Sequence, residues 1–130
     1  FVGLLDPETG TLKYINAGHE EAFVLAGGVI KAELPPTGPV VGLFAGANHD
    51  INSVSLEYGD SLFAYSDGVP EATSKAGEHY SEERLRALLQ TFDGGADQLI
   101  EMIINSINDF TKGARQYDDI TMLACRRETR

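Results

Sequence analysis

Two short acidic stretches carry the side chains best suited to chemistry in this 130-residue chain. Asp67 follows the apolar run 62–65 and is followed by Gly68, whereas Asp118 and Asp119 directly precede the mostly apolar stretch 120–125. If the two apolar stretches form neighbouring antiparallel strands, these acids meet at one edge of a sheet. Carboxylates brought together repel each other, so such a cluster usually implies a bound cation. Oxygen ligands favour magnesium, manganese or calcium over zinc.

Each stretch also has a purely structural interpretation. Asp-Gly is a common turn pair, and two aspartates before a strand often form an exposed loop. Asp67 is harder to explain as an ordinary turn residue, because it stands at the end of an apolar run that is expected to form a core strand. A third candidate is His19, which ends the sequence Asn16-Ala17-Gly18-His19. It could bind a ligand or a phosphoryl group, but a hydrogen bond to a loop carbonyl is favoured because no second histidine stands at ligand spacing.

The composition of the chain disfavours several classes of binding partner. Twenty Asp and Glu against ten Lys and Arg give a formal net charge of −10, which disfavours binding to nucleic acid or to an anionic membrane surface. A phosphorylated ligand would then need local neutralisation, for which a divalent cation is the usual device. The single cysteine, Cys125, excludes an internal disulfide and lies in an apolar run, so an inert core thiol in a cytoplasmic protein is expected. The sequence contains no apolar run of membrane-spanning length.

Strands dominate the first half of the chain, and helices come late. Turn residues and alternating apolar positions predict two hairpins, an extended loop packed on the core, two further strands, a helix pair and a closing strand. Ser81 is the expected N-cap of the first helix. This order predicts one α+β domain over residues 1–130, with antiparallel sheet and helices layered on one face. The expected segments are 1–6 with 11–18, 21–26 with 29–34, 34–48, 51–56, 61–66, 81–92, 96–110 and 120–126.

Six phrases along the chain, taken together and in order, resemble one family. They are TGTLKYINAGH, the diglycine hairpin, PTGPVVGL, YGDSLFAYSDGVPEA, GEHYSEERL and QYDDITMLACR. The family is that of the PPM/PP2C-type metal-dependent protein serine/threonine phosphatases, and the most similar branch is the SpoIIE/RsbU-like regulators of sigma-factor partner switching. The resemblance extends from Phe1 to about Arg127, nearly the whole chain.

The resemblance implies an α-β-β-α sandwich with two manganese or magnesium ions at one end of the sheets. Asp67 and Asp118 match the family's metal ligands, and Asp119 falls where an auxiliary or indirect metal role is implied. Gly68 would let the chain turn tightly beside the metal. In the family a metal-bridging hydroxide attacks phosphorus in line, without a phosphoenzyme intermediate. The residues Asn16, Gly18 and His19 match an Asn-Ala-Gly-His motif whose implied role is to shape the floor of the site.

One element of the family pattern is absent. Its first metal motif, an Asp-Gly whose acid bridges both ions, precedes the region represented here, so we expect a domain truncated at its N-terminus and half a metal site. The expected function is hydrolysis of phosphoserine or phosphothreonine on an anti-anti-sigma (STAS-type) protein, under an upstream sensor domain. As an isolated chain it should be weak or inactive, and exposed apolar surface could make it self-associate. The alternatives are a non-catalytic scaffold of the same ancestry that binds a partner and, less favoured, a calcium-binding module.

Overall fold

A computed structural model describes residues 1–116 and 118–128 of the chain. Tyr117, which belongs to the QYDDITMLACR phrase, lies outside the described residues. The order of elements is the predicted one, with six strands, two helices and a closing strand. They are β1 (Val2–Leu5), β2 (Thr11–Ile15), β3 (Ala22–Ala26), β4 (Val29–Leu34), β5 (Asn52–Ser55), β6 (Ser61–Tyr65), α1 (Glu82–Leu89), α2 (Ala96–Thr111) and β7 (Met122–Arg126).

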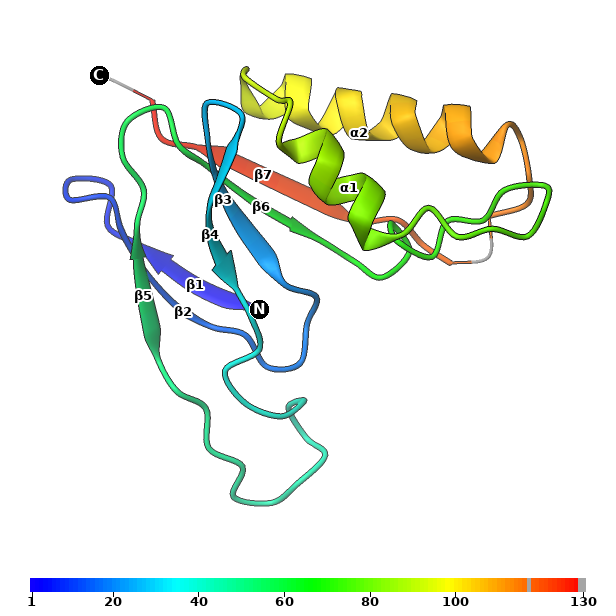
Figure 1. The fold of residues 1–130 in the computed structure, drawn as a ribbon. Helices are drawn as coiled ribbons and strands as arrows, with labels where there is room; N and C mark the ends of the chain where they lie inside the picture. Colours follow the sequence, from blue (N-terminus) through cyan, green and yellow to red (C-terminus); the bar gives the residue numbers. More distant parts are fainter. Residues whose placement is uncertain (117, 129–130) are drawn as a thin grey trace.

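The strands form two antiparallel sheets (Figure 1). Sheet A has the order β1-β2-β5, and sheet B has the order β4-β3-β6-β7. Both predicted hairpins are present, and the β3–β4 turn uses Gly27 and Gly28 at φ +50° and +79°, a conformation that glycine adopts without steric cost. The consecutive strands β5 and β6 do not pair with each other, because β5 joins β2 and β6 joins β3.

Sheet B is the middle of three layers. One core lies between the two sheets and contains Leu12, Tyr14 and Val24. A second core lies between sheet B and the helix pair and contains Phe23, Phe63 and Tyr65 together with side chains of α1 and α2. The helices therefore cover only one face of the two-sheet stack (Figure 1), which confirms the predicted α+β layering. On the opposite face of sheet A, Val2 and Leu4 are 72% and 74% exposed.

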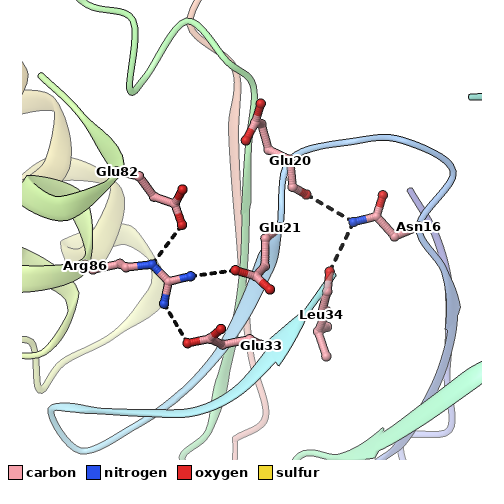
Figure 2. Close-up of polar contacts among 7 residues, drawn as sticks. All are labelled: Asn16, Glu20, Glu21, Glu33, Leu34, Glu82 and Arg86. Carbon is pink, nitrogen blue, oxygen red and sulfur yellow. Dashed lines mark hydrogen bonds and ion pairs between the residues drawn. The ribbon is translucent and has the colours of Figure 1, made fainter. Parts of the chain in front are cut away.

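Arg86 fastens α1 to sheet B (Figure 2). Its guanidinium donates hydrogen bonds to Glu21 at 2.5 Å, to Glu33 at 2.6 Å and to Glu82 at 2.8 Å, and lies 4.8 Å above the ring of Phe23. The hydrogen bond from Arg86 lowers the pKa of Glu33, whereas burial raises the pKa of Glu21. Glu33 of β4, Glu82 of α1 and Glu21, which directly precedes β3, therefore all bind the same guanidinium. These contacts align the helix layer with sheet B.

Two local predictions were wrong, and a third was right only in position. Ser81 is the N-cap residue of α1, as predicted, but its φ is +70° and its side chain makes no capping hydrogen bond. Cys125 is exposed, because β7 is an edge strand of sheet B and the neighbouring Leu123 is also 56% exposed. The loop between β4 and β5 was expected to pack on the core, but residues 40–46 are exposed throughout.

No described helix is both long enough and apolar enough to cross a membrane.

At the end of β7, Arg127 ties the two sheets together. Its guanidinium donates hydrogen bonds to four backbone carbonyls and stacks over a tyrosine ring at 4.2 Å. The acceptors are Pro7, Glu8 and Thr9 in the β1–β2 turn and Leu56 after β5, and the ring is that of Tyr58. Because Arg127 follows sheet B and the acceptors belong to sheet A, the contact holds the sandwich closed at this end.

Candidate functional site

The ends of β6 and β7 bring the two acidic stretches together. The strands pair antiparallel with Tyr65 opposite Met122, as the sequence led us to expect. Beyond this pair Ser66 continues the contact: its amide donates to the carbonyl of Thr121 at 2.9 Å and its hydroxyl donates to the carbonyl of Asp119 at 3.0 Å. The same hydroxyl accepts a hydrogen bond from the amide of Thr121 at 3.0 Å. The residue before Asp67 is therefore hydrogen-bonded to the backbone on both sides of Ile120, at Asp119 and at Thr121.

Gly68 passes against the backbone of the second acidic stretch. It is buried, and a Cβ placed on it would lie 2.4 Å from the carbonyl oxygen of Asp119 and 2.9 Å from the carbonyl carbon. Real Cβ atoms essentially never come closer than 3.0 Å to such an atom, so only glycine fits without moving the backbone. Glycine at this position is thus needed for close approach of the two chain segments.

The carboxylates themselves face solvent. Asp67, Asp118 and Asp119 are all exposed, and Asp118 Oδ1 accepts a hydrogen bond from the amide of Asp119 at 2.7 Å. Their oxygen donors are of the type that magnesium and manganese prefer. Within residues 1–116 and 118–128, however, no three Asp, Glu, His or Cys side chains come together closely enough to hold a metal ion. The ligand chemistry fits a divalent cation, but the donor set of the described residues is incomplete.

Asn16 organises the neighbouring loop from a fully buried position. Its side-chain amide donates to the carbonyls of Glu20 at 3.2 Å and Leu34 at 3.1 Å (Figure 2), and its Oδ1 accepts from the amide of His19 at 2.9 Å. The ring Nδ1 of His19 lies 3.1 Å from the carbonyl oxygen of Glu20, the type of loop-carbonyl contact that the sequence favoured. Gly18 has φ +80°, a left-handed conformation that favours glycine.

This loop lies beside the acidic strand ends. His19 lines a hollow of about 100 Å³ together with Ser66 and Thr121, the two residues that bond β6 to the start of β7. The structure therefore places the Asn16–His19 loop next to the segments that carry Asp67 and Asp118. The side chain of Asn16 is hydrogen-bonded to backbone groups of the loop and of β4, whereas His19 also lines the hollow at the strand ends.

Two features of this region are not evident from the sequence. Ser66 belongs to the Ser66-Asp67-Gly68 stretch that matches the family motif, but its hydrogen bonds to Asp119 and Thr121 could not be read from the sequence. The second feature is a pocket of about 570 Å³ beside Asp118 and Gly68. The loop after β6 and the segment that ends α2 provide its walls, with polar side chains that include Glu71, His79 and Arg115.

Asn16→Ala is expected to lower the free energy of unfolding by about 2 kcal/mol, because one buried and two partly buried backbone groups lose their hydrogen-bond partner. Urea denaturation followed by circular dichroism measures the difference. Asn105→Ala, which alters an exposed residue of α2, is the control and should change the stability little. Equal stabilities of the two variants would show that the network around Asn16 contributes nothing.

Comparison with known proteins identifies relatives along almost the whole chain. The family model described as "Stage II sporulation protein E (SpoIIE)" matches residues 1–128. Protein IcfG of Synechocystis sp. (strain ATCC 27184 / PCC 6803 / Kazusa) is 36% identical over 124 residues, which are 95% of this chain and 20% of IcfG.

Solved structures show the same fold. The phosphatase domain of the cell fate determinant SpoIIE from Bacillus subtilis, in a manganese-presoaked form, matches with a TM-score of 0.74 at 16% identity, over 99% of this chain and 56% of that one. The RsbU and RsbW domains of Rv1364c from Mycobacterium tuberculosis match with a TM-score of 0.72 at 25% identity, over 97% of this chain and 36% of that one. The chain thus spans about a fifth of its curated relative and at most 56% of these solved chains.

Proposed function

The chain belongs to the stage II sporulation protein E (SpoIIE) family, whose solved members include phosphatase domains, and from this premise we propose that it acts in metal-dependent hydrolysis of phosphoserine or phosphothreonine on a protein. The observation that supports the proposal is that the segments carrying Asp67 and Asp118–Asp119 are held against each other at the paired ends of β6 and β7. A buried glycine and a bridging serine hold these segments together, which a solvent-exposed turn of no function would not require.

In this proposal Asp67 and Asp118 would hold a manganese or magnesium ion, and Asp119 would have an auxiliary role. A divalent ion bound there would activate water and neutralise charge that develops on the phosphoryl group. The chain's own residues would position that chemistry: Ser66 holds the backbone of Asp119 and Thr121 next to Asp67, and the Asn16–His19 loop would form the adjoining floor. Two carboxylates bind such ions weakly, so we expect slow turnover from this chain alone.

The proposed substrate is a phosphorylated anti-anti-sigma protein of the STAS type, and the proposed input is a sensor domain in the full-length protein. Both follow from the resemblance to the regulators of partner switching. A non-catalytic scaffold is the second candidate, favoured by the incomplete donor set within the described part of the chain. The two differ in outcome, because a scaffold would bind the STAS protein without releasing phosphate.

Asp67→Asn and Asp118→Asn are each expected to weaken manganese binding about tenfold and to reduce phosphate release in proportion, because each removes a charged oxygen ligand. Calorimetric titration with manganese measures the first quantity. Phosphate release from a phosphoserine peptide, with excess manganese and then with a chelator, measures the second. The wild-type chain should turn over slowly and stop when the metal is removed.

The matched control is Asp109→Asn, which neutralises an exposed aspartate on α2 and so reproduces the change in net charge. It should leave both quantities unchanged. Robust turnover that Asp67→Asn leaves intact would refute the site assignment. Phosphoprotein binding without any release of phosphate would support the scaffold instead.

A further inference from the structure

Arg115 differs from the other arginines in the described part of the chain. Hydrogen bonds to acceptors within the protein are donated by Arg84, Arg86, Arg126 and Arg127. Arg115 is exposed, and its guanidinium has no hydrogen-bond acceptor among residues 1–116 and 118–128. A guanidinium presents a planar fork of donors that matches the paired oxygens of a carboxylate or a phosphate. The donors of Arg115 are therefore available for an oxyanion from outside the chain.

Arg115 lines the pocket of about 570 Å³ that adjoins the acidic strand ends. The same pocket is lined by Asp118, a proposed metal ligand, and by Gly68, which follows the other proposed ligand. The side-chain amide of Gln116 donates to the carbonyl of Asp118 at 2.7 Å, and this hydrogen bond connects the segment after Arg115 to the acid. A substrate held at Asp118 can thus reach Arg115 within one pocket.

Hydrogen bonds fix both segments that form the pocket. In the loop after β6, Thr73 and His79 form an isolated β-bridge, and the ring Nδ1 of His79 lies 3.2 Å from the carbonyl oxygen of Glu71. At the end of α2, the amide of Ala114 donates to the carbonyl of Thr111 at 3.0 Å. The residue before Arg115 is therefore tied to the helix, and the guanidinium is presented from an ordered turn.

The charge of the pocket differs from that of the whole chain. Its ionisable lining residues are Glu71, His79, Arg115 and Asp118. When a divalent ion neutralises Asp118, as the proposed function requires, Arg115 balances the charge of Glu71. The whole chain has a net charge of −10 and repels anionic ligands at a distance. Arg115 therefore supplies a positive charge at the place where an anionic substrate has to approach.

We propose that Arg115 binds an oxyanion of the phosphorylated protein substrate in this pocket and so positions the substrate at the acidic strand ends. The inference rests on the proposed function and adds a residue that binds the substrate. Two groups of a phosphoprotein present the oxygens that a guanidinium binds: the phosphoryl group itself and a carboxylate beside the phosphorylated residue. Peptides with and without that carboxylate distinguish the two sources.

The test compares Arg115→Ala with Lys13→Ala, which removes the same charge from an exposed position on β2. The probes are two phosphoserine peptides, one with aspartate and one with alanine on both sides of the phosphoserine, titrated calorimetrically in the presence of manganese. We expect Arg115→Ala to bind the aspartate-containing peptide about tenfold more weakly, because a charge-assisted pair is lost, and Lys13→Ala to match the wild type. An equal loss with the alanine-containing peptide assigns Arg115 to the phosphoryl group, and an unchanged affinity for that peptide assigns it to the carboxylate. Arg115→Lys keeps the charge but not the fork of donors, so its affinity should be intermediate.

Several outcomes would overturn the proposal. They are unchanged affinity of Arg115→Ala for both peptides, an equal loss in Lys13→Ala, and no measurable binding of either peptide by the wild type. Titration with manganese alone is a further check, because a weaker affinity of Arg115→Ala for the metal would place its effect on the metal site and not on the substrate. Failure of the proposed function is separate, since it appears as absence of manganese-dependent phosphate release from the peptides by the wild type.

Discussion

Gly68→Ala is expected to lower the free energy of unfolding by about 3 kcal/mol and to weaken manganese binding about tenfold. The added methyl group would lie 2.4 Å from the carbonyl oxygen of Asp119, and a backbone atom cannot rotate away as a flexible side chain can. The segments after β6 and before β7 must then separate. Separation breaks the two hydrogen bonds of the Ser66 hydroxyl and moves Asp67 away from Asp118.

Urea denaturation measures the loss of stability, and calorimetric titration with manganese measures the loss of affinity. The control is Gly95→Ala at the start of α2, where φ is −80° and the nearest contact of an added Cβ is at 3.7 Å. That variant should bind manganese like the wild type and should lose less stability than Gly68→Ala, because its only cost is that alanine is a poorer N-cap than glycine. If Gly68→Ala were as stable as Gly95→Ala and bound manganese equally well, close approach of the two acidic stretches would not matter for the site.

Arg127→Ala is expected to destabilise the chain by about 3 kcal/mol, because four backbone carbonyls lose a charged donor at once. The carbonyl of Leu56 is affected most, since its hydrogen bond is partly buried and water replaces the donor there less easily. The loss also removes the contact with the ring of Tyr58. Because Arg127 joins the end of sheet B to sheet A, the two sheets should loosen at the end opposite the acids.

Thermal and urea denaturation measure this effect. Arg115→Ala is the matched control, because it removes an exposed arginine and makes the net charge more negative by the same amount. Arg127→Lys retains the charge but not the planar fork of donors, so an intermediate stability is expected. If Arg127→Ala and Arg115→Ala were equally stable, the stabilisation would come from net charge and not from the hydrogen bonds to the two sheets.

Local features of the fold were predictable because they depend on neighbouring residues. The diglycine of the β3–β4 turn and the apolar spacing of α2 indicate their elements within a few residues. The missing capping hydrogen bond of Ser81 and the exposure of Cys125 were not predictable. The first depends on how the preceding loop enters the helix, and the second depends on β7 being an edge strand, which is a property of the sheet.

For the candidate site, residue type and position pointed to Asp67, Asp118 and His19, and the match to a family motif added Asn16. Their proximity required the pairing of β6 with β7 and the hollow shared by His19, Ser66 and Thr121. The roles of Ser66 and Arg127 could not be inferred, because each bonds to backbone atoms remote in the sequence. Every residue has a backbone carbonyl, so the sequence does not indicate which carbonyl will accept such a hydrogen bond.

The order of strands and helices, the α+β class and the types of residue at the acidic strand ends could all be predicted without the structure. These follow from propensity, periodicity and glycine placement, which act over short distances along the chain. The tertiary contacts place β5 and β6 in different sheets, require glycine at position 68 to clear Asp119, and leave the loop at residues 40–44 exposed. Each of these depends on contacts between segments distant in the sequence, which a local pattern does not encode.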